Sequence, residues 1–207
     1  MRIAIVGGTG DFGRALAARL VALGEDEVVI GSRDAERAAA AAAELGAAGG
    51  ATNDEAVREV DLAVLAVKAE AALETARATA AALGTTPVLS VASALSFAKD
   101  GVRPGGDARS LAERVQDVVR GPVAAGLHSI AAANLGASPP DEDALVCGDD
   151  DGAKRLALEL AGKVVRGRAL DAGPLAGART LEGLTAVIVN LNRRYRAHAG
   201  IRITGLA

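Results

Sequence analysis

The first thirteen residues hold the feature that most constrains how this chain can fold. Residues 3–6 form an apolar run typical of a buried strand, and Gly8-x-Gly10-x-x-Gly13 follows at once, leading into a long Ala- and Leu-rich helical pattern. Glycines at this spacing, between a strand and a helix, allow a tight turn and let the backbone approach a pyrophosphate. The free N–H groups of the helix N-terminus then bind that group. The residues of the predicted dinucleotide-binding turn are Gly8, Thr9, Gly10, Asp11, Phe12 and Gly13.

The end of the second predicted strand indicates which dinucleotide is bound. Residues 27–30 read as that strand, and it runs into Gly31-Ser32-Arg33, with Arg37 one helical turn further on. An NAD site usually has a carboxylate here for the ribose 2′-hydroxyl, and this chain has none. Arginine is suited to bidentate phosphate binding. We therefore expect Ser32, Arg33 and Arg37 to bind the 2′-phosphate of NADP; a solvated arginine pair on a helix face is the alternative.

Apolar and helical runs alternate through residues 1–127, which predicts a Rossmann-type doubly wound parallel α/β sheet with helices on both faces. A small C-terminal α/β lobe is expected to follow, so we divide the chain into residues 1–127, which bind NADP, and residues 128–207. Strands are expected at 2–6, 27–30, 61–66, 87–91, 123–127, 145–148 and 168–171, and helices at 10–23, 35–45, 70–83, 108–119, 152–162 and 179–196. Residues 97–107 read as a loop, either a cover over the site or a plain surface excursion.

Composition excludes several classes of function. A net charge of −3 offers no basic surface for nucleic acid, and no apolar run reaches the 18 residues of a membrane span. The single Cys147 excludes an internal disulfide, and a strand at residue 2 leaves no signal peptide, so a cytoplasmic protein is expected. With two His and one Cys we expect no bound metal, and we interpret Asp149–Asp151 as helix capping.

Few side chains are candidates for chemistry. His128 follows the fifth strand, which borders the nicotinamide side of such a sheet; it would contact the cofactor amide, donate to an accepting ring, or serve only the structure. Ser90 and Ser93 lie at the end of the fourth strand and either line the cleft or are ordinary loop residues.

Several motifs together resemble the NADPH-dependent F420 reductases, also called F420H2:NADP oxidoreductases. The glycine turn and Gly31-Ser32-Arg33 are similar to the family's phosphate-binding segments, and the segment from Leu127 to Ala133 is similar to its fifth-strand segment. Residues 146–151 and 170–175 are close to its C-terminal signatures, and Arg179, Glu182, Thr185 and Asn190 fall in register on the last helix. Two positions depart from the family: Val67-Lys68-Ala69 stands where Pro, often followed by Trp, is usual, and Gly183 where serine is usual.

The resemblance implies hydride transfer between NADPH and the deazaflavin coenzyme F420, with the C-terminal lobe completing the deazaflavin site. Backbone donors, His128 or Thr185 would stabilise the charge on the reduced ring. The expected catalytic residues are His128 and Thr185, and Val67, Ser90, Ile130 and Arg179 are expected to join the cofactor-binding residues above. Alternatives are an NADP-dependent reductase of a small imine or carbonyl compound, or a non-catalytic NADP sensor. The expected partners are NADP(H) and F420, with a homodimer as the expected assembly and neither nucleic acid nor membrane among the partners.

Overall fold

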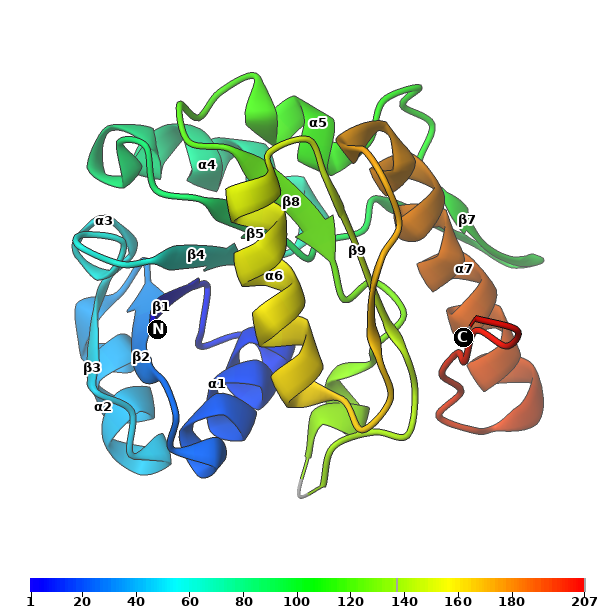
Figure 1. Ribbon diagram of the computed structural model, residues 1–207, viewed down its shortest axis with the longest axis horizontal. Helices are drawn as coiled ribbons and strands as arrows, with labels where there is room; N and C mark the ends of the chain where they lie inside the picture. Colours follow the sequence, from blue (N-terminus) through cyan, green and yellow to red (C-terminus); the bar gives the residue numbers. More distant parts are fainter. Residues whose placement is uncertain (137, 207) are drawn as a thin grey trace.

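The computed structural model describes residues 1–136 and 138–206, and its centre is one twisted sheet (Figure 1). The strand order is β3-β2-β1-β4-β5-β8-β9-β10, and every neighbouring pair is parallel except β8 and β9. The strands are β1 (Arg2–Val6), β2 (Glu27–Ser32), β3 (Gly49–Thr52), β4 (Leu62–Leu65), β5 (Val88–Ser90), β8 (Val123–Gly126), β9 (Ala144–Gly148) and β10 (Ala169–Asp171). The order reverses between β1 and β4, and ligands of such sheets bind where the carboxyl ends of the strands meet that reversal. The predicted fold class is confirmed.

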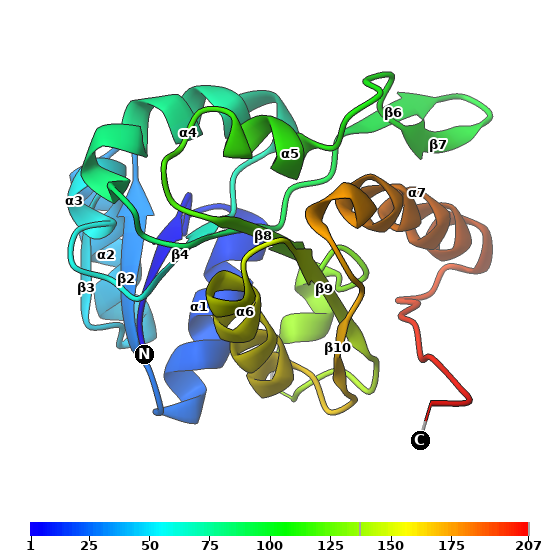
Figure 2. The same cartoon turned by 45° about the horizontal axis from the view of Figure 1, so that its top comes forward.

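Helices cover both faces of the sheet, as the alternating pattern predicted (Figures 1 and 2). A separate hairpin of β6 (Leu95–Ala98) and β7 (Gly101–Pro104) lies beside the last helix. The helices are α1 (Asp11–Leu23), α2 (Ala35–Leu45), α3 (Asn53–Ala56), α4 (Ala69–Leu83), α5 (Leu111–Gln116), α6 (Asp151–Val164) and α7 (Ala178–Tyr195), with 3₁₀ turns η1 (Ala132–Leu135) and η2 (Leu175–Gly177).

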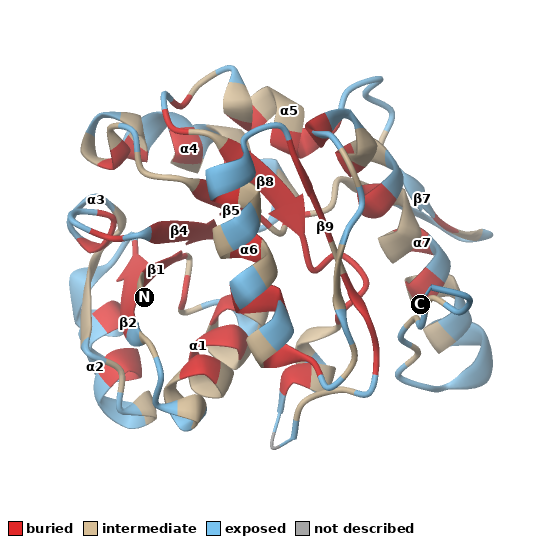
Figure 3. Ribbon diagram, in the orientation of Figure 1, coloured by how far each residue is buried: buried red, intermediate tan, exposed pale blue. Residues whose placement is uncertain are grey.

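Alternate residues of each strand enter two different cores, because successive side chains of a strand point to opposite faces of the sheet. Ile3 and Ile5 of β1 pack with Leu16 of α1 and Leu160 of α6. The intervening β1 residues Ala4 and Val6 belong to the opposite core, with residues from α4 and α5. Buried residues therefore follow the strands and the inner sides of the helices (Figure 3), and this packing fixes the strand ends on which the site is built.

The helix starts differ in one way that bears on function. Asp34, Ser110 and Asp150 accept hydrogen bonds from the first turns of α2, α5 and α6, which satisfies N–H groups left free there. The capping role predicted for the acidic run 149–151 is thus confirmed at Asp150. Gly10 begins α1 with no side-chain cap, as Lys68 begins α4 and Gly177 begins α7, so the first turn of α1 keeps N–H groups for another acceptor.

The part of the chain after residue 127 shares its sheet with the part before it. β9 pairs with β8 and β10 pairs with β9, while α6 packs beside α1 in one core. α7 lies at the far end of this sheet, with the β6–β7 hairpin against it (Figure 2). The division at residue 127 remains a prediction about function, since the hydrogen bonding joins both parts.

The expectation of a loop over residues 97–107 is wrong for residues 97–104. Residues 95–104 form the hairpin, which α7 holds through the Asn190 side chain: its Oδ1 accepts from Val102 N at 2.8 Å and its Nδ2 donates to Val102 O at 2.7 Å. The predicted helix at 108–119 is shorter, with α5 ending at Gln116.

Sequence reasoning also missed β3 and α3. Gly49-Gly50-Ala51-Thr52 has little strand propensity, yet it pairs with β2. A Cβ at Gly50 would lie 2.1 Å from the Ala38 carbonyl oxygen, so close packing on α2 requires this glycine.

Among the described residues, no helix is both long and apolar enough to cross a membrane.

Candidate functional site

The turn after β1 is tight because two of its glycines pack against backbone. Gly8 N donates to Ile5 O at 3.0 Å and to Gly31 O at 2.9 Å, which ties the turn to β2. A Cβ at Gly8 would lie 2.9 Å from Ile5 O, and one at Gly13 would lie 2.7 Å from Gly7 O. Contacts this short are not tolerated, so these glycines serve the turn and the approach of α1 to the sheet.

Gly10 is glycine for a different reason. Apart from its chain neighbours, Gly7 O at 3.4 Å is the one atom of the described residues within 4 Å of a Cβ built there, so the surrounding protein leaves room for a side chain. Because α1 also lacks a side-chain cap, open space and free N–H groups coincide at one point. This is the arrangement that a pyrophosphate needs: backbone that it can approach closely, at the positive end of a helix dipole. The structure thus fits the dinucleotide expected from the sequence.

The other predicted turn residues surround this point. Thr9 Oγ1 donates to Ser32 Oγ over 3.4 Å, which links the turn to the end of β2. Asp11 is exposed in the first turn of α1, and Phe12 is half-buried against the core.

The end of β2 carries the predicted ribose residues. Ser32 is buried, and its Oγ also accepts from Asp34 N at 3.3 Å. Arg33 and Arg37 are exposed, and neither guanidinium forms an ion pair within the described part of the chain. Two uncommitted guanidiniums beside a buried hydroxyl suit a phosphate ester better than a ribose hydroxyl.

Val67 stands after β4, next in the sheet from β1. A Cβ on Gly7 would lie 2.5 Å from Val67 Cγ1, so Val67 packs directly on the glycine turn. Gly7 has a φ of +77°, a conformation that favours glycine in any case. The neighbouring Lys68 is exposed at the start of α4.

Three hydroxyl and imidazole groups meet beyond the ends of β5 and β8. Ser93 Oγ lies 3.2 Å from His128 Nδ1 and 2.7 Å from Thr185 Oγ1. Thr185 Oγ1, on α7, donates to His128 O at 2.7 Å. The structure therefore unites His128 with Thr185, the two predicted catalytic residues, and adds Ser93, which the sequence reasoning left as an alternative.

The surroundings of this cluster are apolar. His128 is 6% exposed, and within the described residues its Nε2 has no hydrogen-bond partner. Burial lowers the pKa of His128 to about 4, against an opposing effect of the Val91 carbonyl, so the imidazole is neutral at physiological pH. Ser90 is fully buried and its Oγ likewise lacks a partner in the described chain, while Ile130 is buried nearby along the sequence. Leu127, just before His128, has a φ of +64°, a strained conformation for a branched residue.

Arg179 is placed differently from the other predicted residues. Its Nη2 donates to Gly105 O at 2.6 Å and its Nε donates to Asp107 O at 3.1 Å, so it tethers the segment that leaves the hairpin. One turn along α7, the buried Glu182 accepts from Leu111 N at 2.7 Å and caps α5. Desolvation raises the pKa of Glu182, and the backbone donors and Arg179 oppose that rise.

Two cavities of the described structure lie away from the glycine turn. One, of about 460 Å³, lies between residues 134–142 and the C-terminal tail, and the other, of about 260 Å³, lies beside α4, α5 and the hairpin. We therefore recognise the site by its backbone geometry and its polar groups.

The strand order, the glycine turn and the uncapped start of α1 define a Rossmann-fold protein of the dinucleotide-binding class. Comparison with known proteins identifies the family within this class. Residues 2–94 match the family described as "NADP oxidoreductase coenzyme F420-dependent". The chain belongs to this family.

Whole-length relatives support that assignment. The chain is 38% identical to the F420-dependent NADP reductase of Methanothermobacter marburgensis, covering 100% of this chain and 99% of the relative. It is 39% identical to the F420-dependent NADP reductase of Methanothermobacter thermautotrophicus, covering 100% and 96%. A crystal structure from Arthrobacter sp. FB24, provisionally assigned as an F420-dependent NADP-reductase, superposes with a TM-score of 0.86 at 24% identity, covering 99% of this chain and 100% of that one. This last likeness shows the fold.

Proposed function

We propose that this protein is an F420H2:NADP⁺ oxidoreductase, which transfers a hydride reversibly between NADPH and coenzyme F420. One observation carries the proposal. The strands β2, β1, β4, β5 and β8 are consecutive neighbours in the sheet, and a predicted site residue lies at the carboxyl end of each. Ser90 is the last residue of β5, and the other four strands are followed, in the same order, by Arg33, Gly10, Val67 and His128. An extended nucleotide laid along these ends meets the arginines at its 2′-phosphate, Gly10 at its pyrophosphate, and the His128 region at its nicotinamide.

The reaction makes modest chemical demands on the chain. Forward transfer moves a hydride from the nicotinamide to C5 of the deazaflavin and a proton from solvent to the same ring, giving NADP⁺ and F420H2. The cofactors supply the electronics, and the protein supplies alignment of the two rings and exclusion of water. We assign NADP binding to residues 1–127 and completion of the deazaflavin site to residues 128–207.

We place the deazaflavin between Ile130 and α7 near Thr185. Ile130 follows β8 and is buried, and the Thr185 hydroxyl is anchored on the same segment through His128 O. Arg179 is one turn from Gly183, where the chain lacks the serine usual in the family. The Nε and Nη2 atoms of Arg179 donate to the carbonyls of Asp107 and Gly105, which fixes the direction of its guanidinium.

The direct test mixes protein, NADPH and F420 and follows the visible absorption band of the deazaflavin. Bleaching that requires both protein and NADPH supports the proposal. If F420 is not reduced but NADPH is oxidised with a small cyclic imine, the protein is instead a reductase of small substrates. NADPH binding with no turnover of either acceptor indicates a sensor.

A variant locates the acceptor. Thr185→Trp places a bulky ring beside His128 and is expected to abolish F420 reduction while NADPH binds as in the wild type, measured by calorimetry. Wild-type F420 reduction by this variant would contradict the placement on α7.

We further propose that the protein is a cytoplasmic homodimer that associates through α7. Val187, Leu191 and Tyr195 are spaced four residues apart on this helix and are exposed by 53%, 41% and 68%. Phe97 of the hairpin is exposed beside it, under the Arg193 guanidinium. An apolar stripe of this kind is typical of a buried interface. Light scattering of the wild type and of Leu191→Glu tests it, with the variant expected to be monomeric; a wild-type monomer would refute the dimer.

A further inference from the structure

The Ser93–His128–Thr185 cluster contains three short contacts, and each needs a proton between its two atoms. The contacts are Thr185 Oγ1 to His128 O, Ser93 Oγ to Thr185 Oγ1, and Ser93 Oγ to His128 Nδ1. A carbonyl oxygen only accepts hydrogen bonds, and each hydroxyl has a single proton to donate. These limits determine which atom donates in each of the three contacts.

The assignment runs in one direction along the cluster. His128 O requires the Thr185 proton, so Thr185 Oγ1 must accept from Ser93. Ser93 has then used its proton, and its Oγ can only accept from His128 Nδ1. Any other assignment leaves two acceptor atoms facing each other within 2.7 Å or 3.2 Å without a proton.

We propose that Ser93 is a positioning residue that fixes His128 as the Nδ1–H tautomer, so that Nε2 presents a lone pair to an N–H donor of the bound cofactor. In this tautomer the second ring nitrogen is an acceptor. His128 Nε2 is buried and has no partner by hydrogen-bond geometry in the described part of the chain, as expected of an atom reserved for a ligand, although the Val91 carbonyl also acts on the imidazole and raises its pKa. The proposal rests on the proposed function, because that function supplies the N–H donor. This donor is either the carboxamide of the nicotinamide or a ring N–H of the deazaflavin.

The proposal also reassigns a role expected from the sequence. A neutral Nε2 acceptor cannot stabilise negative charge on the reduced deazaflavin, and the Thr185 proton is already committed to His128 O. Of the three kinds of donor expected there, only backbone N–H groups remain. His128 then orients a ring and takes no part in proton transfer.

Nitrogen-15 NMR of the unliganded protein reads the tautomer directly. The chain has only two histidines, and the exposed His198 is assigned by its loss in His198→Gln. In the wild type, His128 Nδ1 is expected to resonate as a proton-bearing nitrogen and Nε2 as an unprotonated one. If the wild-type protein carries the proton on Nε2, donated for example to the Val91 carbonyl, the proposal is overturned.

Two variants separate positioning from packing. Ser93→Ala removes the acceptor for Nδ1–H, so the Nε2–H form should gain population, whereas Ser93→Thr keeps the hydroxyl and should restore the wild-type spectrum. Ser90→Ala removes another buried hydroxyl, one that forms no hydrogen bond in the described part of the chain, and its spectrum should match the wild type. An unchanged His128 spectrum in Ser93→Ala overturns the proposal.

Kinetics supply the second readout. Ser93→Ala is expected to lower kcat/KM for F420 reduction by roughly tenfold, about the value of one hydrogen bond, and Ser93→Thr to recover it. Far-ultraviolet circular dichroism verifies that each variant is folded. Because the tautomer is measured without cofactor, a protein that lacks F420 activity but shows Nδ1–H would refute the proposed function alone.

Discussion

Single atoms decide most of what this site can bind. Gly8 and Gly13 are required by the protein's own backbone, whereas Gly10 is surrounded by space that only a ligand would use. The turn could be predicted from sequence because its signal is local: a strand, glycines at fixed spacing and a helix. Ser93 could not be recognised in this way, since its partners are 35 and 92 residues away and only the fold joins them.

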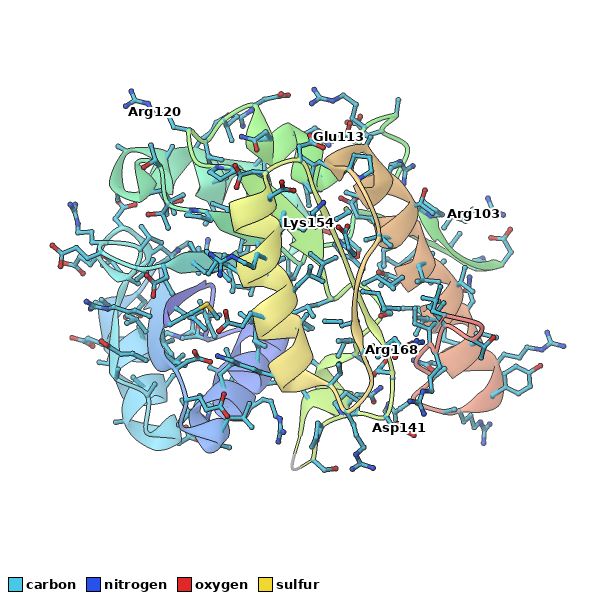
Figure 4. The ribbon with its side chains drawn as sticks, viewed as in Figure 1. Arg103, Glu113, Arg120, Asp141, Lys154 and Arg168 are labelled. Carbon is cyan, nitrogen blue, oxygen red and sulfur yellow. The ribbon has the colours of Figure 1, made fainter. Side chains whose placement is uncertain are left out.

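The first prediction at this scale concerns nucleotide choice. Arg33→Ala should weaken NADPH binding by about one to two decades, because losing one charge-assisted hydrogen bond costs roughly 1.5–3 kcal/mol. NADH lacks the 2′-phosphate, so its weaker affinity should stay nearly the same. Calorimetric titration with both nucleotides measures the two effects. Arg120→Ala is the matched control: Arg120 is exposed and lies at the periphery of the molecule (Figure 4). Equal losses for NADPH and NADH would refute the phosphate role.

A second residue-scale prediction compares two glycines three positions apart. Gly10→Val should leave a folded protein that no longer binds NADPH, because the side chain fits the protein but fills the pyrophosphate's place. Gly13→Val should lower the melting temperature, since its Cβ would lie 2.7 Å from Gly7 O. Thermal unfolding with and without NADPH distinguishes the two. A folded Gly10→Val variant with wild-type affinity would place the phosphates elsewhere.

Among the helices and strands, those with a strong local sequence signal could be predicted, and those that depend on tertiary contacts could not. β1 and α1 have strong periodicity and were predicted to within a residue or two of their observed bounds. β6 and β7 have four residues each, mostly exposed, and their pairing depends on Asn190 of α7. No sequence window around residues 95–104 contains that partner, so the local pattern predicts a loop over residues 97–107 instead of a hairpin.

The C-terminal tail gives a prediction for one element. Asp143 is buried and accepts from Arg168 N, Arg168 Nη2 and Ile203 N, which join the tail to the start of β10. Figure 4 shows Arg168 and Asp141 at the side of the molecule where the tail runs. Asp143→Asn replaces one acceptor oxygen by a donor, so the Ile203 amide should exchange with solvent about tenfold faster in hydrogen-exchange NMR.

The control and the pH dependence follow from the same contacts. Asp141→Asn removes only an exposed ion pair with Arg202 and should change little. The Arg168 side chain and the backbone donors hold the pKa of Asp143 well below its ordinary value of 3.8. The contribution of Asp143 to the stability of the folded protein is therefore complete above pH 3.8. It is lost as the pH falls through the lower pKa that Asp143 has in the folded state. Wild-type exchange at Ile203 in Asp143→Asn would show that the tail is held by other contacts.

For the whole molecule, the continuous sheet predicts that residues 1–127 do not fold alone, although the proposed function divides the chain there. The fragment would lose β9 from the edge of β8 and the five buried residues of α6: Ala153, Ala157, Leu160, Ala161 and Val164. A fully buried leucine or valine contributes roughly 1.5–3 kcal/mol, and a domain is stable by only about 5–15 kcal/mol in total. Removing α6 and exposing the apolar strand face beneath it therefore takes away much of the margin. The fragment is expected to give a poorly dispersed amide NMR spectrum and no measurable NADPH affinity, whereas the full chain gives a dispersed spectrum and binds. A dispersed spectrum together with NADPH binding by residues 1–127 would show instead that the nucleotide-binding part is an independent folding unit, and that β9, α6 and β10 are attached to a core already complete without them.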